Sequence, residues 1–214
     1  MVQTHFYDND TLIDEVVNQK QLHPVLKDKA HLPYQDAFIK EFYQNISEED
    51  IKKHDSSDLY ALALTVLEFT KVRQKGKPKI RIYHPSKEHH GVEIEETILE
   101  VISDDKPFII DSLIEALNKL NLHIKLLIHP IFSIERDQND EITSVASASG
   151  KGGNDESVVQ IRFDKKITPT LFNTIIDNIK ATLSMVDLAV KDWQTMVQKM
   201  DTIIEETKIV TLKD

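Results

Sequence analysis

The chain has 214 residues, with 26 lysines and arginines against 36 aspartates and glutamates, which gives a formal net charge of −10. It contains no cysteine, so disulfide bonds, thiolate nucleophiles, iron–sulfur clusters and thiolate zinc sites are excluded. Its hydrophobic content of 40% and charged content of 29% are those of an ordinary globular protein with one or two domains. The negative charge argues against nucleic acid or an anionic membrane as a partner.

Residues 1–76 carry helical patterns and few strand signals. Ser47 followed by Asp50 forms a capping box, and residues 55–58 open the longest helix of this half, which we expect to end at Gly76. We therefore predict a helical lead-in domain over residues 1–76. The chain starts without a basic and apolar leader and has no apolar run long enough to cross a membrane, so we expect a cytoplasmic protein.

Residues 77–192 form the second predicted domain, in which strand and helix patterns alternate. In chain order we predict strands at 79–83 and 96–103, a helix from 109, a long strand at 124–134, a strand at 157–163, a helix from 168 and a short strand at 186–190. From residue 96 this is the β-α-β-β-α-β order of the ferredoxin-like unit, so we predict an α+β fold with an antiparallel sheet. We expect residues 193–214 to form a C-terminal helix that connects to downstream domains.

Pro130 lies inside the predicted strand at 124–134. Proline cannot donate a hydrogen bond to a neighbouring strand, so a strand that contains it belongs at a sheet edge or carries a bulge. In the ferredoxin-like order this strand is an edge strand. The proline and the predicted topology therefore agree.

The five glycines of the chain do not form a nucleotide-binding loop. Gly150 and Gly152 begin the G-x-G-x-x-G spacing, but Asp155 occupies the third position and a strand pattern follows where a helix is required. Lys151 is followed by glycine where a phosphate-binding loop needs serine or threonine. We therefore expect no cofactor to bind within this segment.

Nine histidines raise the question of a metal site. His84, His89 and His90 lie close together in the sequence, but adjacent side chains point in different directions and no third ligand is evident. His123 and His129 share one face of a strand, where surface or interface histidines are the simpler interpretation. We expect no metal site.

Three acids surround the turn between the strand at 96–103 and the helix that follows it: Asp104, Asp105 and Asp111. Paired carboxylates can act in acid–base catalysis. The simpler interpretation is that they cap the helix, with Asp105 interacting favourably with the helix dipole. No G-x-S-x-G motif surrounds a serine, and we expect no catalytic residue in the chain.

Six basic residues occur within residues 71–81 with no acid among them. In a chain of net charge −10 this is the clearest local charge anomaly. Arg73, Lys77, Lys79 and Arg81 form a candidate anion-binding patch, and a solvated basic surface is the alternative.

Three longer runs of residues carry more information than the strand and helix patterns within them. Residues 97–113 read TILEVISDDKPFIIDSL, residues 123–137 read HIKLLIHPIFSIERD, and residues 156–164 read ESVVQIRFD. Together with Pro78-Lys-Ile-Arg-Ile-Tyr83 and Val190-Lys-Asp-Trp193, these runs resemble the N-terminal region of the large bacterial NAD-specific glutamate dehydrogenases. The resemblance extends from about residue 35 to residue 200.

The resemblance implies that residues 77–192 form an ACT-like domain, a ferredoxin-like regulatory module that often binds amino acids and pairs with other copies through its sheet. It also implies that the NAD site and the glutamate-deaminating residues lie far downstream in a much longer chain, so that NAD is a cofactor of the full-length enzyme only. This segment would then be a non-catalytic regulatory or assembly region. The implied partners are the downstream domains of the same polypeptide, further copies in a homo-oligomer, and an amino-acid effector.

In ligand-binding ACT domains the first turn from strand to helix has a sequence similar to Asp-Arg-Pro-Gly. The glycine lets the carboxylate of an effector approach the backbone amides. This chain has Asp105-Lys-Pro-Phe108 there. We expect the Phe108 ring to fill the site or pack inward, which favours contact between copies or with the rest of the enzyme. The candidate effector or interface turn consists of Asp104, Asp105, Lys106, Pro107, Phe108 and Ser112.

Two alternatives remain open. A stand-alone amino-acid sensor would use the turn at 104–112. An oligomerisation module would pair the apolar edge strand at 124–136 across a two-fold axis.

Overall fold

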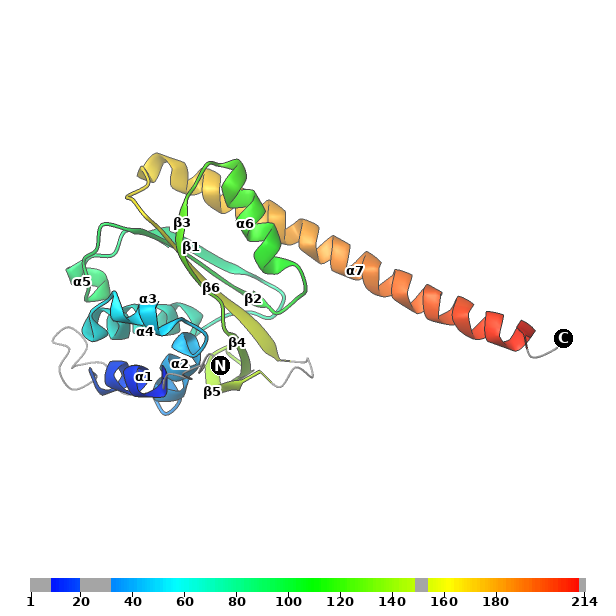
Figure 1. Cartoon of the computed structure of the whole chain (residues 1–214), viewed down its shortest axis with the longest axis horizontal. Helices are drawn as coiled ribbons and strands as arrows, with labels where there is room; N and C mark the ends of the chain where they lie inside the picture. The colour runs from blue at the N-terminus through cyan, green and yellow to red at the C-terminus, as the bar shows by residue number, and fades with distance from the viewer. Residues whose placement is uncertain (1–8, 20–31, 149–153, 212–214) are drawn as a thin grey trace, which may run out of the picture. The chain divides into compact units, whose positions relative to one another are not determined.

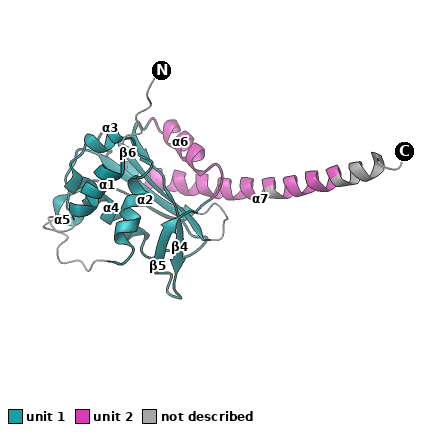
Figure 2. Ribbon diagram, turned by 60° about the horizontal axis from the view of Figure 1, so that its bottom comes forward, with its two compact units in different colours: residues 1–105, 122–172 teal, residues 106–121, 173–214 magenta. Residues whose placement is uncertain are grey.

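The computed structural model of the protein describes residues 9–19, 32–148 and 154–211. The chain divides into two compact units, which Figure 2 distinguishes by colour. Unit 1 comprises residues 1–105 and 122–172, and unit 2 comprises residues 106–121 and 173–214.

Unit 1 begins with helices and continues with a sheet. Its helices are α1 (Asn9–Asn18), α2 (Gln35–Tyr43), α3 (Glu48–Lys52), α4 (Ser56–Thr70) and the short α5 (Lys87–His90), with a 3₁₀ helix η2 (Pro169–Leu171) near its end. Its strands are β1 (Lys79–Tyr83), β2 (Thr97–Asp104), β3 (Ile124–Ile128), β4 (Ile131–Arg136), β5 (Ile142–Ser147) and β6 (Asp155–Phe163). Unit 2 contains α6 (Ile109–Lys119) and α7 (Phe172–Thr211), except that Phe172, the first residue of α7, belongs to unit 1.

The predicted helix starts in the N-terminal half are confirmed. The Oγ atom of Ser47 accepts a hydrogen bond from the backbone N–H of Asp50, and the Asp55 carboxylate caps α4 by accepting one from Ser57. Helix α4 ends at Thr70, earlier than expected, because Val72 leaves the helix and forms a β-bridge with Glu141.

The strands form one antiparallel sheet. Its order is β1-β2-β6-β4-β5, and β3 also pairs with β6. All the pairings among the described strands are antiparallel. The predicted α+β class, with N-terminal helices, an antiparallel sheet and a long C-terminal helix, is confirmed.

The N-terminal helices and the sheet of unit 1 share one hydrophobic core. Figure 1 shows α1 to α4 gathered beside the sheet. Phe38 of α2 stacks on Phe132 of β4, with ring centroids 4.5 Å apart and planes within 3°. Tyr43, Ile102 and Val158 belong to the same cluster of buried residues. The predicted domain boundaries after residues 76 and 192 stay predictions.

The long strand expected at 124–134 is two strands. Pro130 separates β3 from β4, as the missing donor requires. Among the described strands β3 pairs only with β6, whereas β4 lies between β6 and β5, so only the first half is an edge. Strand β5 was not predicted, because Ile142 alone of its six residues is buried and the strand shows no clear apolar alternation.

The prediction of a short strand at 186–190 is wrong. The two helices expected before and after it form a single helix. Helix α7 runs without interruption through this segment. Val186 and Val190 lie four residues apart on one buried helix face, whereas Leu188 between them is 64% exposed. Three apolar residues at alternate positions therefore fit a helix as well as a strand. Strand β2 lies between β6 and β1 in the sheet, and β1 precedes β2 in the chain.

Helix α6 confirms the predicted apolar face, since Ile109, Leu113 and Leu117 are buried. Within the described part of the chain, no helix combines the length and the apolar character needed to cross a membrane.

Candidate functional site: a buried charge network and its cavity

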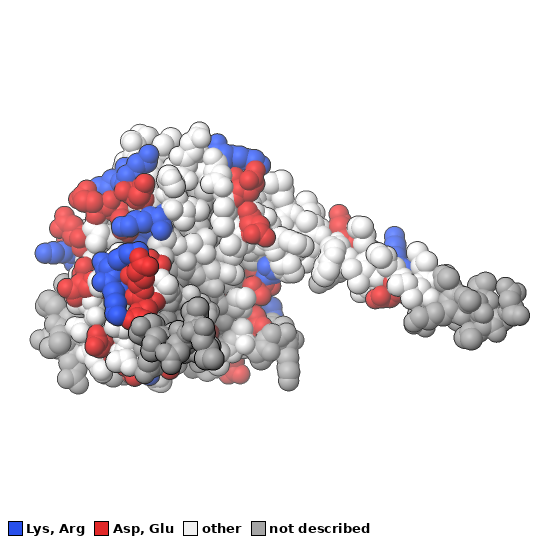
Figure 3. Space-filling view, in the orientation of Figure 1, with Lys and Arg blue, Asp and Glu red and all other residues white. Residues whose placement is uncertain are grey.

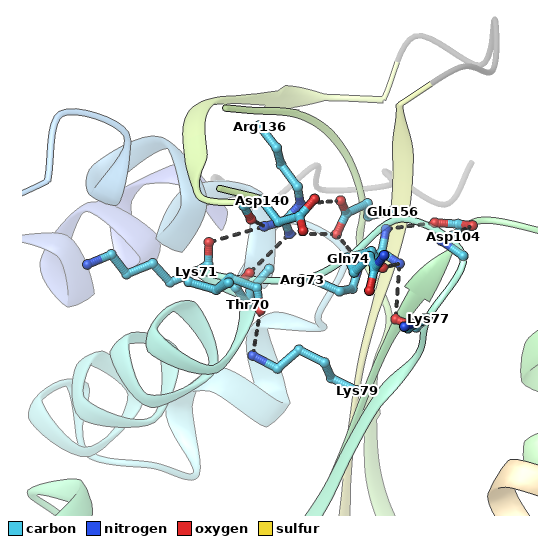
Figure 4. A network of polar contacts seen from close by, with 12 residues as sticks. Thr70, Lys71, Arg73, Gln74, Lys77, Lys79, Asp104, Arg136, Asp140 and Glu156 are labelled. Atoms are coloured by element: carbon cyan, nitrogen blue, oxygen red, sulfur yellow. Dashed lines mark hydrogen bonds and ion pairs between the residues drawn. The ribbon is translucent and has the colours of Figure 1, made fainter. Parts of the chain in front are cut away.

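A carboxylate at the start of β6 binds two arginines. Arg136 of β4 donates from Nε to Oε1 of Glu156 across 2.7 Å, and from Nη2 to Oε2 across 2.9 Å. Arg73, in the segment after α4, donates from Nε to Oε2 of the same carboxylate across 2.9 Å and from Nη2 to Oδ1 of Asp104 across 2.7 Å. Figure 4 shows these side chains converging. Arg73 and Glu156 are buried, and Arg136 is nearly so.

The other guanidinium donors reach backbone carbonyl groups. Arg136 donates to the carbonyl oxygens of Thr70, Lys71 and Asp140 at 2.8–3.1 Å. Arg73 makes longer contacts of 3.4 Å with the carbonyl oxygens of Gln74 and Lys77. The network therefore fastens the segment after α4 to the ends of β2, β4 and β6 with charge-assisted hydrogen bonds.

Glu156 is held in its charged form. Burial raises the pKa of this carboxyl, but hydrogen bonds from Arg136 and Arg73, together with their charges, outweigh burial and lower the pKa below its ordinary value. Burial likewise opposes the charge of Arg73, while Glu156 and Asp104 favour it and raise its pKa.

A cavity of about 480 Å³ borders this network within unit 1. Three basic residues line it together with six acidic ones: Arg73, Lys75 and Arg136, and Asp104, Asp105, Asp137, Asp140, Asp155 and Glu156. Its volume lies in the range of small-molecule sites. The Oδ1 atom of Asp155 is buried and has no hydrogen-bond partner among the described residues. Since Glu156 and backbone carbonyls occupy the arginines, the wall offers a ligand acidic oxygen atoms more readily than guanidinium donors.

Two residues of the predicted effector turn reach this cavity. Asp104 accepts hydrogen bonds from Arg73 and from the backbone N–H of Gly76, at 2.7 and 3.0 Å. The backbone N–H of Asp105 donates to the carbonyl of Asp155 across 2.9 Å. The predicted cap by Asp105 is wrong, because α6 starts at Ile109 and no side chain caps it.

The other four residues of the turn belong to unit 2. Lys106 forms an ion pair with Asp187 of α7, Pro107 is exposed, and the backbone N–H of Ser112 donates to the carbonyl of Phe108. The expectation that the Phe108 ring packs inward is wrong, since the residue is 53% exposed. Its φ of 71° is the left-handed conformation that glycine adopts most easily. The backbone at residue 108 thus keeps a glycine-like geometry although the residue is phenylalanine.

The four residues of the predicted anion patch do not share one exposed surface. Arg73 belongs to the buried network. Arg81 pairs with Glu100 and donates to the carbonyl of Thr65, and the Lys79 ammonium group donates to the carbonyls of Phe69 and Val72. Burial, followed by the charges of Arg136, Arg81 and Arg73, lowers the pKa of Lys79. Lys77 is exposed, and anion binding by these residues stays a prediction.

Sequence reasoning missed Arg136 and Glu156. An alternating strand pattern normally places its polar residues in solvent, but every residue of β6 from Glu156 to Phe163 is buried. Its polar face forms a second buried row, in which Arg162 donates to Gln160 and Gln160 donates to Glu100. The sequence of β6 does show charged and amide side chains at its polar positions, which is compatible with a buried polar row. It does not show which residues these side chains bind.

Three of the described histidines contact three different partners. His84 lies 3.0 Å from the carbonyl of Ile167, and His129 Nε2 lies 2.7 Å from Ser157 Oγ. His90 stacks on the ring of Tyr83. In the described ranges no three His, Cys, Asp or Glu side chains are arranged to hold a metal ion.

The antiparallel sheet, its N-terminal helices and the long last helix define an α+β module. The chain belongs to the family described as glutamate dehydrogenase, ACT1 domain, whose sequence profile matches residues 38–179. Two curated relatives carry the name NAD-specific glutamate dehydrogenase. The protein of Halomonas elongata is 29% identical over 182 residues, and that of Pseudomonas aeruginosa is 27% identical over 176 residues.

These matches cover 84% and 81% of this chain but only 11% of each relative. The chain therefore spans a small part of the length of the curated relatives that it matches. No solved structure matches it. The resemblance expected from the three sequence runs is confirmed.

Proposed function

We propose that this chain is the N-terminal regulatory and assembly region of a cytoplasmic NAD-dependent glutamate dehydrogenase. The whole enzyme converts L-glutamate, NAD⁺ and water to 2-oxoglutarate, ammonia and NADH. The observation that carries the proposal is the family match over residues 38–179, together with two relatives that are NAD-specific glutamate dehydrogenases. The partners of the region are the downstream domains of the same polypeptide and further copies of the chain.

The region itself is non-catalytic, and NAD binds elsewhere in the full-length enzyme. In support, the sequence has no glycine-rich loop of the dinucleotide-binding kind, and the two arginines at the cavity are engaged by Glu156. The test is to incubate purified residues 1–214 with L-glutamate and NAD⁺ and to follow NADH by absorbance. No formation of NADH is expected, and glutamate-dependent formation would contradict the proposal.

A second candidate function is the sensing of an amino acid at the cavity of unit 1. It is favoured by the position of Asp104 and Asp105 in the wall and by the mixed charges around them. Since acidic residues outnumber basic ones there, a cationic amino acid such as arginine or lysine fits better than glutamate. Calorimetric titration with the twenty amino acids tests this function. Heat that appears with the cationic ones and is lost in Asp155→Asn supports it, and uniformly flat titrations remove its support.

A further inference from the structure

Helix α7 carries one continuous seam of the coiled-coil kind. Positions separated alternately by four and three residues lie along it: Ile175, Ile179, Thr182, Val186, Ala189, Trp193, Met196, Met200 and Ile203. All but Thr182 are apolar. Spacings of this kind keep the side chains on the side of a helix that faces a partner helix.

The two halves of this seam differ in exposure. The first four residues, from Ile175 to Val186, are buried, at 0–7% exposure. Trp193, Met196, Met200 and Ile203 are 48–60% exposed. On the face of the molecule seen in Figure 3, α7 presents mainly uncharged atoms, interrupted by a few acidic and basic side chains. Exposed apolar surface of this extent marks a binding surface.

A groove lies where the buried half of the seam meets the exposed half. It is a cavity of about 500 Å³ within unit 2, lined by Met185, Val186 and Ala189 of α7 and by Phe108 and Ala116 on the side of α6. The small alanine side chains leave room for larger ones from another helix. The surface offered to a partner therefore includes the groove as well as the exposed end of the helix.

We propose that α7 pairs with α7 of a second copy of this chain in an antiparallel coiled coil. Trp193 then lies opposite Met196 of the second copy, Ala189 opposite Met200 and Val186 opposite Ile203. The second copy places its Met200 and Ile203 at the groove, and the two-fold axis makes the contact reciprocal. This interface deepens the assembly part of the proposed function and rests on it.

The charges beside the seam select this arrangement. Asp192 and Lys199 each stand one position before a seam residue, and in an antiparallel pair such flanking positions face each other. In the proposed register Asp192 of each copy faces Lys199 of the other. A shift by seven residues places Lys199 against Lys199, and a parallel pair places Asp192 and Lys199 beside the apolar Val197 and Ile204. Of these arrangements, only the proposed register sets Asp192 opposite Lys199.

The exposed area suits a dimer. Seven large apolar side chains on or beside the seam of α7 are 36–62% exposed: Met185, Trp193, Met196, Val197, Met200, Ile203 and Ile204. At half exposure such side chains offer on the order of 100 Å² each. Together they approach the roughly 800 Å² per partner of a standard interface.

Cysteine cross-linking tests the register, because the natural chain contains no cysteine. In the double variant Ala189→Cys/Met200→Cys the two positions are about 16 Å apart along one helix, too far for a disulfide within one chain. Oxidation is expected to give a covalent dimer of this variant. The single variant Met200→Cys and the double variant Trp193→Cys/Ile203→Cys are expected to stay monomeric under the same conditions. Cross-linking of the single variant Met200→Cys would show a parallel pair. Cross-linking only of Trp193→Cys/Ile203→Cys would show the antiparallel register shifted by seven residues. Either result would overturn the proposal.

Sedimentation equilibrium of residues 1–214 tests the charge pairs. Lys199→Glu is expected to weaken dimerisation about tenfold, since it sets two acids against each other twice. The double variant Asp192→Lys/Lys199→Glu is expected to restore the natural affinity, and Gln198→Glu, on the side of the helix away from the seam, to leave it unchanged. A chain that is monomeric at all concentrations, or a double variant as weak as Lys199→Glu, would overturn the proposed interface. Neither result would affect the assignment to a dehydrogenase, which is tested separately by immunoprecipitation.

Discussion

Arg73 and Glu156 are 83 positions apart in the chain and form a buried ion pair with Nε and Oε2 separated by 2.9 Å. Arg136 binds the same carboxylate through two further hydrogen bonds. One glutamate therefore compensates two arginines that have little access to water.

Replacing this carboxylate is expected to destabilise unit 1 strongly. Glu156→Gln leaves the guanidinium group of Arg136 without its anion and leaves Arg73 with Asp104 alone, and breaking a buried ion pair in this way typically costs about 3–5 kcal/mol. Urea unfolding with an unchanged m-value measures this loss. The matched control is Glu95→Gln, because Glu95 is 83% exposed in its pair with Lys166, and a change within about 0.5 kcal/mol is expected there. Equal losses in both variants would refute the special role of Glu156.

Replacement of Phe108 by glycine is expected to destabilise the protein less than its replacement by alanine. Its φ of 71° disfavours any residue with a Cβ atom, by about 1–2 kcal/mol, and its exposed ring contributes little burial. Phe108→Gly should therefore unfold at a higher urea concentration than Phe108→Ala. The opposite order would show that the left-handed backbone at this residue is not maintained in solution.

The stability of the protein is expected to fall as the pH drops from 7.5 to 5.5. Burial lowers the pKa values of His54, His90 and His129 below the ordinary value of 6.5. Between the folded and unfolded pKa values the unfolded chain binds more protons, so the stabilisation present above pH 6.5 is lost as the pH falls. Urea midpoints across this range measure the slope. His129→Gln should reduce the slope, because it removes one of these buried titrating groups.

The depressed pKa of Glu156 adds a second loss at lower pH. A carboxyl with a lowered folded pKa stabilises the protein above its unfolded pKa, and that stabilisation disappears as the pH falls through the folded value. The Glu156→Gln variant should lack this second, more acidic phase. An unchanged acid limb in the variant would exclude Glu156 as its cause.

The shared core of unit 1 makes the N-terminal helices and the sheet interdependent. Phe38→Ala removes a fully buried ring that stacks on Phe132 and is expected to cost about 3–5 kcal/mol. Hydrogen exchange should show amides of α2 and β6 losing protection together. The control Leu171→Ala removes a side chain that is 47% exposed and should change neither. Loss of protection confined to the helices would indicate a separately folding lead-in domain.

Local patterns predicted most of the elements of this fold. The caps at Ser47 and Asp55 depend on neighbouring residues only, so they could be identified from the sequence. The errors arose where a pattern fits two structures or gives no signal. Val186, Leu188 and Val190 alternate like a strand but belong to a helix, and β5 is too exposed to show an apolar pattern.

The candidate site could be predicted only in part. Asp104, Asp105 and Arg73 were identified as unusual, and the structure places all three in one cavity wall. The pairing of Arg73 with Glu156 depends on the register of β2 against β6, which sets Asp104 opposite Glu156. Such long-range register is a property of the tertiary fold, and a single sequence does not display it.

The most direct test of the central claim is immunoprecipitation from an extract of the source cells with an antibody against residues 1–214. The expected result is a polypeptide far larger than 24.6 kDa, together with precipitated activity that reduces NAD⁺ only when L-glutamate is added. A precipitated band near 24.6 kDa without that activity would contradict the assignment of this chain to the front of a glutamate dehydrogenase.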